Sequence, residues 1–422
     1  MQEKMKEETE TIQNSLPDDP EMFSLIEQEK QRQSRELRLI PSENYVSRNV
    51  LNALGSVLVN KYSEGYPGFR YYEGTEVVDK IESLTRERAK KLFGVDHANV
   101  QPYSGSPANM AVYFALLKPG ETMLGMGLRD GGHLTHGAPA SFSSRFYKAI
   151  SYHVNPQTGY LEMNQVRELA KEHKPSLIIC GGSAYPRILD FSAFREIANE
   201  VGARLLVDMA HFGGLVAAGS YPSPAPYADI ITMTTHKVLR GPRGGLILCK
   251  SDYAQAIDRA IFPGLQGGPH NHTIAGIAVA LHEAASPAYK NYGKKVVENA
   301  KELASQLLSE GFTLVTGGTD THLMLIDLRP KNLPGSTLAK ALARAGIVCN
   351  ANTVPGETGS PKHPSGLRLG TPAVTTQGMG KKEMQFIAKK ISAIASSPTN
   401  ENLIAKTHQE VEELSLQYPI PC

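Results

Sequence analysis

The stretch Thr-Thr-His-Lys at 234–237, followed by Leu-Arg-Gly-Pro-Arg-Gly-Gly at 239–245, decides the fold of this chain. It comes directly after the run Ala228–Met233, whose apolar content predicts a buried strand. Lys237 therefore stands at the end of a strand, among small polar residues and glycines, where its amine can form a Schiff base with an aldehyde. Taken alone, a surface lysine after a strand is the simpler interpretation, so the rest of the chain has to decide.

Helices and short apolar strands alternate from about residue 75 to 250. The patterns predict helices at 78–93, 108–117 and 194–201, and strands at 99–102, 176–180 and 204–208. Such alternation is typical of an α/β protein with a largely parallel sheet.

A change of pattern near Ser286-Pro287 predicts a domain boundary after a helix at 273–285. Beyond it we expect a smaller α+β unit, with helices at 292–311 and 338–345, a strand at 323–328 and a final long helix at 381–396. Residues 1–40 are polar and predicted to be helical, with a helix start at Asp18-Asp19-Pro20. The predicted division is a helical segment at 1–40 that makes dimer contacts, a large domain at 41–287 and a small domain at 288–422.

Composition indicates a globular protein. Among 422 residues, 41% are hydrophobic and the net charge is only +2, which allows a substantial core and argues against nucleic acid as the main partner. The cysteines at 180, 249, 349 and 422 show neither a disulfide framework nor zinc spacing, and the first three are predicted to be buried thiols. A signal peptide or a run of about 20 apolar residues is not seen, so we expect a cytoplasmic protein without a membrane partner.

Asp208 ends one predicted strand, and Lys237 follows 29 residues later, after the next. In an open parallel sheet both residues lie at carboxyl ends, where ligands bind. A carboxylate in that position can pair with the protonated pyridine nitrogen of pyridoxal phosphate (PLP) and keep the ring an electron sink. By itself Asp208 fits a helix cap or a turn, but the pairing with Lys237 favours the cofactor.

Two loops could contact such a cofactor. Ser104-Gly105-Ser106 lies between a predicted strand and a helix, where backbone amides bind phosphate, although an ordinary N-capped helix looks the same. His133 and His136 lie in a glycine-flanked loop. Because no nearby cysteine or carboxylate completes a zinc set with this pair, we expect no metal, and His133 suits stacking on a flat ring better.

Two further segments carry polar groups. Residues 61–72 concentrate tyrosines and Glu64 in a stretch too rich in glycine and proline for a helix. Arg368 lies between apolar neighbours on a predicted short strand, where an inward guanidinium needs an anion such as a substrate carboxylate, or a structural salt bridge.

Together these stretches resemble the serine hydroxymethyltransferase family, PLP enzymes of fold-type I. The resemblance implies an α/β fold-type I transferase: a large domain with a mostly parallel seven-stranded sheet sandwiched by helices, plus a smaller C-terminal α+β domain. The matching motifs run in order over nearly the whole chain and lie at 39–44, 60–68, 101–106, 131–137, 207–211, 234–237, 241–245, 262–269 and 366–373.

The resemblance also implies a role for each matching residue. Around the cofactor, Lys237 would form the internal aldimine, Asp208 would pair with the pyridinium and His133 would stack on the ring. Ser183 and His211 would lie near the phenolic oxygen of that ring. The phosphate would be held by Ser104, Gly105, Ser106 and His236, and Tyr62 and Gly268 of a second subunit would complete this phosphate site. Around the substrates, Ser42, Tyr72 and Arg368 would bind the amino-acid carboxylate, and Glu64 would transfer the proton at the serine hydroxyl or at folate. Thr234 and Arg243 would position the lysine. A folate site would be lined by Leu128, Gly132, Leu134 and Asn352.

The implied reaction is the reversible transfer of the serine hydroxymethyl group to tetrahydrofolate. Serine would displace Lys237 to form an external aldimine, and the ring would hold the resulting carbanion as a quinonoid. The products would be glycine and 5,10-methylenetetrahydrofolate, with roles in one-carbon metabolism and in glycine biosynthesis. At least a homodimer is implied, because Tyr62 and Gly268 would act across an interface.

Three rival functions stay open on the sequence. Two are sister PLP enzymes, a folate-independent threonine-type aldolase and an α-methylserine hydroxymethyltransferase; the third is a non-catalytic PLP-binding protein. Glu64 and Asn352 favour folate use, and the retained Lys237 and Arg368 argue against loss of catalysis. Ala351 stands where lysine is common in the family, which is expected to alter folate affinity or the preference for its polyglutamate tail.

Overall fold

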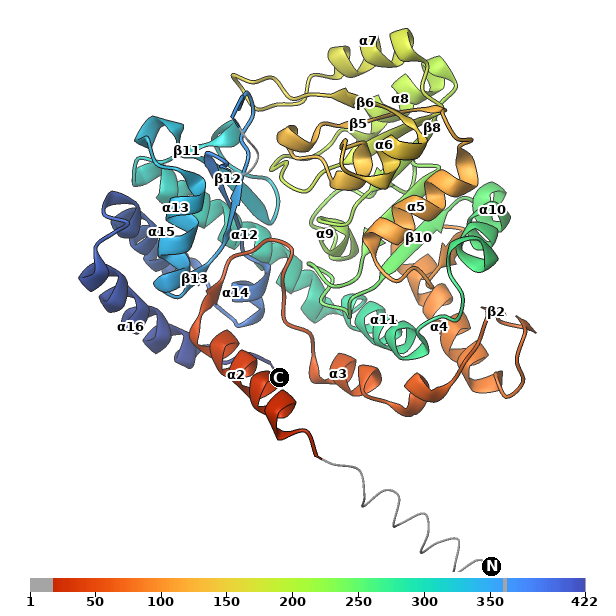
Figure 1. Ribbon diagram of the computed structural model, residues 1–422, viewed down its shortest axis with the longest axis horizontal. Helices are drawn as coiled ribbons and strands as arrows, with labels where there is room; N and C mark the ends of the chain where they lie inside the picture. The colour runs from red at the N-terminus through yellow and green to blue at the C-terminus, as the bar shows by residue number, and fades with distance from the viewer. Residues whose placement is uncertain (1–17, 360–362, 422) are drawn as a thin grey trace, which may run out of the picture.

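The computed structural model describes residues 18–359 and 363–421. It has two bodies, each built around its own sheet, and the long helix α12 (Pro287–Ser309) runs between them (Figure 1). α12 contacts α9 (Gly213–Ala217) of the larger body and α15 (Lys381–Ser396) of the smaller one. The predicted boundary at 286–287 coincides with the start of this helix; the division into domains stays a prediction.

The larger body contains the predicted seven-stranded sheet. Its order is β4 (His97–Asn99), β10 (Gly245–Cys249), β9 (Ile230–Thr234), β8 (Arg204–Asp208), β7 (Leu177–Gly181), β5 (Thr122–Met126) and β6 (Lys148–Tyr152). Strand β10 runs antiparallel to both neighbours, whereas the other neighbouring pairs are parallel. The mostly parallel sheet is therefore confirmed, and β4 lies about two residues before the strand expected at 99–102.

Both faces of this sheet are buried, which explains its nearly continuous apolar strands. Alternate residues point to opposite faces: Leu205 and Val207 of β8 pack in one cluster, while Leu206 packs in another. The first face is covered by α4 (Glu76–Phe93), α7 (Met163–His173), α8 (Phe191–Val201) and α11 (Asn271–Ala284), and the second by α5 (Gly105–Leu116) and α10 (Ala254–Arg259).

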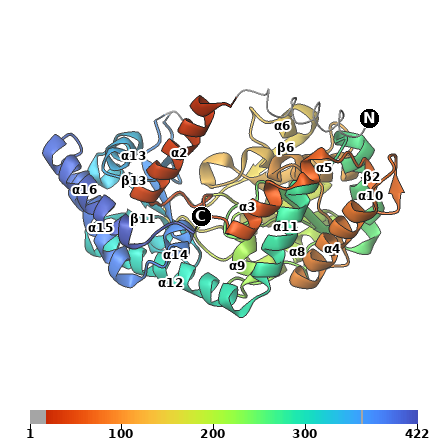
Figure 2. The same ribbon diagram turned by 90° about the horizontal axis from the view of Figure 1, so that it is seen from below.

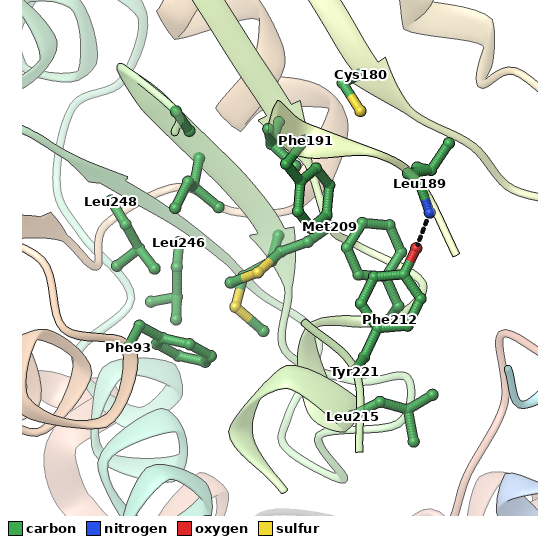
Figure 3. Close-up of a cluster of buried hydrophobic side chains, with 14 of the residues drawn as sticks. Phe93, Cys180, Leu189, Phe191, Met209, Phe212, Leu215, Tyr221, Leu246 and Leu248 are labelled. Carbon is green, nitrogen blue, oxygen red and sulfur yellow. Dashed lines mark hydrogen bonds between the residues drawn. The ribbon is translucent and has the colours of Figure 1, made fainter. Parts of the chain in front are cut away.

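Figure 3 shows part of the larger cluster, in which the rings of Phe191, Phe212 and Tyr221 lie together. The rings of Phe212 and Tyr221 stack with centroids 4.4 Å apart. The Tyr221 hydroxyl accepts a 2.9 Å hydrogen bond from the backbone amide of Leu189, so the buried phenol keeps a polar partner. This packing fixes the loops that leave the carboxyl ends of β7 and β8.

The smaller body has a four-stranded antiparallel sheet in the order β11 (Thr313–Leu314), β12 (Leu323–Asp327), β15 (Gly366–Gly370) and β14 (Asn350–Asn352). Helices α13 (Gly335–Arg344) and α15 occur as predicted. One expectation was wrong: α15 is not the last long helix, because α16 (Glu401–Gln417) follows it. The buried stripe of α16 includes two polar residues, Thr407 and Ser415, so the hydrophobic periodicity of its sequence is weak.

The N-terminal segment is only partly helical. α2 (Pro20–Arg35) begins where expected, with Asp19 capping the amide of Met22 at 3.0 Å. Leu37–Arg38 then forms β1, which pairs in parallel with β13 (Ile347–Val348), so the helical prediction for 1–40 fails at this point; residues 1–17 lie outside the described part. α2 contacts α16, and both views place it on the side of the smaller body (Figures 1 and 2).

Two expectations from composition can be compared with the structure. Cys180 and Cys249 are buried free thiols, as expected, whereas Cys349 is only partly buried; Cys422 lies outside the described residues. Across 18–359 and 363–421, no helix has the length and apolar content needed to cross a bilayer.

Candidate active site

A cavity of about 1240 Å³ lies between the two sheets. Its floor is formed by loops that leave the carboxyl ends of the parallel strands, and β14 and β15 of the smaller sheet supply another wall. The predicted site residues that line it are Ser42, Ser104, Gly105, Ser106, Leu128, Gly132, His133, Leu134, Ser183, Asp208, His211, Thr234, His236, Lys237, Arg243, Asn352 and Arg368.

Lys237 occupies the turn after β9 and is only 9% exposed. Burial lowers its pKa to about 8, even though the nearby Asp208 acts in the opposite direction. Its backbone carbonyl accepts a hydrogen bond from Asn44 Nδ2 at 3.2 Å, and Thr234 Oγ1 donates to the carbonyl of Ala210 at 3.2 Å. The lysine is thus held on a fixed backbone, with an amine that is partly neutral near neutral pH.

Asp208 is the last residue of β8, on the strand next to that of Lys237. Its Oδ2 accepts hydrogen bonds from His136 Nε2 and from Asn109 Nδ2, both at 2.9 Å, and its Oδ1 accepts one from the amide of Ala210 at 3.0 Å. Burial alone would raise the pKa of Asp208, but the hydrogen bonds from His136 and Asn109 outweigh it and hold that pKa well below its usual range. The group is an anion at neutral pH, suited to a cationic partner.

His133 and His136 are brought to this carboxylate by the short turn at 134–136. His136 Nδ1 accepts from the His133 amide at 3.2 Å, which leaves Nε2 to donate to Asp208. Burial lowers the pKa of His133 to about 4, so its ring is neutral. A flat neutral imidazole next to a buried carboxylate suits stacking on an aromatic ring.

The structure corrects one step of the sequence argument. Asp208, distant in sequence, supplies the carboxylate that appeared to be missing near His133 and His136, and the three residues offer ligand atoms within 4.8 Å of one another. Those atoms are already bound to protein partners, since His133 Nδ1 lies 2.8 Å from Thr135 Oγ1 and the others hold each other. We keep the expectation that the cluster serves a ring rather than a metal.

The loop at 104–106 fits a phosphate. Ser104 is the N-cap of α5, yet among the described residues its side chain receives no capping hydrogen bond from the helix. His236 Nδ1 is buried and finds no hydrogen-bond partner in the described chain. A Cβ at Gly105 would lie 2.7 Å from Thr234 Cγ2, so a side chain there would crowd the end of β9. Free amide donors, an unpaired imidazole nitrogen and a bare backbone are what an anion needs.

Arg368 reaches the cavity from β15 of the smaller sheet. Its Nη1 donates to the carbonyl of Ser183 at 2.6 Å and its Nε to Asn350 Oδ1 at 3.1 Å. Burial lowers the pKa of Arg368 to about 10, so the guanidinium is still charged at neutral pH. Its remaining N–H donors are suited to a substrate carboxylate.

His211 lies under the same part of the cavity and is paired with a residue that sequence reasoning missed. His322, immediately before β12, has its Nε2 3.4 Å from His211 Nδ1, and the two rings stack with centroids 5.6 Å apart. Burial, followed by the charge of Lys237, holds the pKa of His211 well below its usual value. His211 is therefore a neutral group beside the lysine.

Four predicted residues lie elsewhere. Tyr62, Glu64, Tyr72 and Gly268 are absent from the described lining of the cavity and instead cluster together on the surface. Tyr62 donates to Glu64 Oε1 at 3.2 Å, and its ring centroid lies 5.0 Å from that of Tyr72. A Cβ at Gly268 would lie 3.0 Å from the Tyr62 ring. We call these four residues the Tyr62 cluster.

A buried ion pair fixes the backbone of the Tyr62 cluster. Arg70 and Glu82 are 3% and 2% exposed and meet at 2.8 Å. Arg70 Nη1 also donates to the carbonyls of Ser63 and Gly65, on either side of Glu64, at 2.9 and 2.8 Å. Gln101 Nε2 donates to the same Gly65 carbonyl at 2.9 Å. The short hairpin of β2 (Gly65–Tyr66) and β3 (Phe69–Arg70) therefore presents Glu64 rigidly.

Sequence reasoning missed the residues that support the functional groups: Asn109, Thr135, His136, His322, Arg70 and Glu82. Only His136 had a visible signal, the His-x-x-His spacing with His133. The others are ordinary polar residues of helices and loops, and their partners lie far away in the sequence.

Comparisons with known proteins agree with this geometry. The family model for serine hydroxymethyltransferase matches residues 16–391. A serine hydroxymethyltransferase from Desulfotalea psychrophila is 58% identical over 96% of this chain and 95% of its own length. Those from Acidothermus cellulolyticus and Sorangium cellulosum are 54% and 55% identical, over 97% and 96% of this chain and 99% and 95% of their own lengths.

The sheet order, the buried lysine and the carboxylate on the neighbouring strand define a fold-type I PLP-dependent transferase. Within that class, the chain belongs to the serine hydroxymethyltransferase family.

Proposed function

We propose that the protein transfers the hydroxymethyl group of serine reversibly to tetrahydrofolate, giving glycine and 5,10-methylenetetrahydrofolate. The observation that carries the proposal is the placement of buried Lys237 in one cavity with the Asp208 carboxylate, the loop at 104–106 and Arg368. PLP, bound there, supplies an electron sink for the carbanion that forms when the Cα–Cβ bond of serine breaks.

The residues of the chain divide the remaining work. Asp208 holds a proton on the pyridine nitrogen, since an anionic carboxylate stabilises the cation beside it. His133 would stack on the ring, and Ser183 and His211 would contact its phenolic oxygen. Thr234 and Arg243 would position Lys237.

The amino acid is held by its carboxylate. Arg368 binds it through the donors that Ser183 and Asn350 leave free, and Ser42 and Tyr72 complete the grip. Ser42 lines the cavity together with Arg368. Fixing the carboxylate orients the bonds at Cα relative to the ring, and orientation of this kind lowers the barrier.

We propose that a second copy of the chain completes each site. The Tyr62 cluster contains the residues expected to finish the phosphate site, Tyr62 and Gly268, and also the proton carrier Glu64 and the carboxylate ligand Tyr72. The same stretch of chain, 57–72, also carries Val57, Phe69 and Tyr71, which are 79%, 84% and 73% exposed. Apolar exposure of this extent is typical of an interface, so a homodimer, or a higher oligomer built from it, is the functional unit.

Leu128, Gly132, Leu134 and Asn352 are proposed to hold the folate. Leu128 and Leu134 are 42% and 50% exposed at the cavity, as expected for residues that cover a flat ring. Ala351 on β14 offers no cation to the folate tail. The alternatives are threonine-type aldol cleavage without folate and action on α-methylserine. We place the protein in the cytoplasm, in one-carbon metabolism and glycine biosynthesis.

The test adds PLP, serine and tetrahydrofolate to the purified protein and measures glycine and methylenetetrahydrofolate. We expect transfer to require all three, and Glu64→Gln to lose transfer while it still binds PLP. Cleavage of threonine without any transfer from serine to tetrahydrofolate would support the aldolase instead. If the protein showed no cofactor absorption band after PLP is supplied, the whole proposal would fail.

A further inference from the structure

Asn109 links the two side chains that are expected to contact the cofactor ring. It lies on α5, four residues after Gly105, and is 1% exposed. Its Nδ2 donates to Asp208 Oδ2 at 2.9 Å and to Thr135 Oγ1 at 2.8 Å, while its Oδ1 accepts from Thr232 Oγ1 at 2.6 Å. Both amide protons and the carbonyl of this buried group are therefore used.

The orientation of the amide follows from its partners. Were the oxygen turned toward Asp208, it would face an anionic oxygen with no proton between them. Nδ2 must therefore point at the carboxylate and Oδ1 at Thr232, whose hydroxyl can donate. Thr232 is 1% exposed and sits on β9, so the sheet itself holds the amide in this orientation.

The first hydrogen bond from Asn109 Nδ2 fixes the orientation of the Asp208 carboxylate. A carboxylate oxygen accepts about two hydrogen bonds. His136 Nε2 and Asn109 Nδ2 fill both positions on Oδ2, and the Ala210 amide takes one on Oδ1. One acceptor position is left, on Oδ1, for the ring nitrogen.

The second hydrogen bond from Asn109 Nδ2, to Thr135 Oγ1, fixes the tautomer and the orientation of His133. Because Thr135 Oγ1 accepts from Asn109, its own proton is free to go to His133 Nδ1, 2.8 Å away. His133 then carries its proton on Nε2, and its ring is fixed at the Nδ1 side. The same amide thus orients both the Asp208 carboxylate and the His133 imidazole, the two groups expected to contact the cofactor ring.

We infer that Asn109 is a positioning residue that sets Asp208 and His133 together for the PLP ring. The inference rests on the proposed function, because it assumes that PLP binds there. Rigid, fully bonded supporting residues are what keep binding groups in their productive geometry. α5 would then serve the phosphate with its first residues and the ring with Asn109, one turn later.

Asn109→Asp tests this with almost no change of volume. The new carboxylate replaces a donor by an acceptor 2.9 Å from Asp208 Oδ2, so the two groups compete for one proton. The charged or titratable groups facing Asp208, namely His133, His136, Tyr113 and Lys237, are the same in both proteins. We expect PLP affinity of the apoprotein to fall about tenfold or more at pH 8, and by less at pH 6, where the pair holds a proton.

Asn299→Asp is the matched control. Asn299 is also buried, at 4% exposed, and donates to Thr375 Oγ1 at 2.9 Å and to the Met379 carbonyl at 3.0 Å, outside the cavity lining. We expect it to lower the unfolding midpoint while the affinity for PLP and the cofactor absorption band stay as in the wild type.

Each outcome decides something. Wild-type affinity and an unchanged band in folded Asn109→Asp would overturn the inference. If that variant does not fold, Thr135→Val replaces it, because it removes only the branch to His133. A loss of PLP affinity of threefold or more there supports the inference, and no loss overturns it. Failure of the wild-type protein to bind PLP would refute the proposed function instead.

Discussion

Arg368 Nη1 donates a 2.6 Å hydrogen bond to the carbonyl oxygen of Ser183, which joins the smaller sheet to the loop after β7. Ser183 is itself held by the larger body, since its amide donates to the Gly131 carbonyl at 2.5 Å. Arg368, the proposed carboxylate ligand, thus belongs to the smaller sheet but is held in position by a loop of the larger body. Substitutions at Arg368 should affect the substrate and leave the cofactor in place.

Arg368→Ala is expected to lower the affinity for serine by about 10- to 100-fold, because charged hydrogen bonds contribute roughly 1.5–3 kcal/mol. PLP binding should be unchanged. Titration with serine, followed through the cofactor absorption band, measures both. Arg368→Lys keeps the charge without the fork and should recover part of the loss. A normal serine response in the alanine variant would contradict the assignment.

Lys237 should capture PLP faster as the pH rises through about 8, its lowered pKa. Only the neutral amine reacts, so the initial rate should rise about tenfold from pH 7 to pH 9. An unperturbed lysine, with a pKa near 10.4, would give about a hundredfold rise over the same interval. Stopped-flow absorbance on the apoprotein separates the two; a hundredfold slope would mean that burial does not tune this amine.

The apoprotein should also become more stable relative to Lys237→Met as the pH rises from about 8 toward 10.5. In that interval the unfolded lysine binds a proton that the folded one has released, so the free energy of unfolding increases with pH. Below pH 8 both states are charged and the full penalty of burying the cation is present. The total difference is about 3 kcal/mol, measured by denaturant unfolding of both proteins; parallel pH profiles would contradict it.

Breaking the buried pair under the Tyr62 cluster should destabilise the fold strongly. Arg70→Met leaves Glu82 as an unpaired buried carboxylate, whose pKa burial already raises, and should lower the free energy of unfolding by about 3–5 kcal/mol. The double variant Arg70→Met with Glu82→Met should be less destabilised than the single one, because no charge is left unpaired. A loss in the double variant equal to the sum of the losses in Arg70→Met and Glu82→Met alone would mean that the pair is not coupled.

Mixed dimers test the composite site. Lys237→Ala and Glu64→Ala should each be inactive alone. If Glu64 serves the partner's lysine, a heterodimer has one intact site, and random exchange should restore about a quarter of the wild-type activity. If Glu64 serves its own chain, both sites of the heterodimer are damaged and no activity returns. The assay needs only unfolding, mixing and refolding of the two variants together.

Much of the molecule could be predicted from local pattern. The strand ending at Asp208 and the helix 381–396 were predicted to the residue, because β8 is buried from Leu205 to Asp208 and α15 has a strong apolar stripe. The helix α16 was not predicted, because half of the residues on its buried face are polar. The pairing of β1 with β13 escaped because two-residue strands carry no periodicity at all.

The residues of the candidate site likewise fall into a group that the sequence could predict and a group that it could not. Lys237, Asp208 and the loop at 104–106 follow strand ends, so their convergence could be argued from topology alone. The support given by Asn109 and by His322 could not, since each depends on a partner brought close only by the complete fold. The grouping of Glu64 and Tyr72 with Tyr62, away from the cavity lining, likewise required the three-dimensional structure.

The pairing of Leu37 with Ile347 has a consequence for synthesis of the chain. The strands of the larger sheet all lie between residues 97 and 249, so that sheet can close while the ribosome is still translating. At roughly 5–20 residues per second, the partner of Leu37 emerges about 15–60 s after it. The segment from α2 to β1 is therefore made before the larger sheet but reaches its partner strand only after all strands of that sheet have been made.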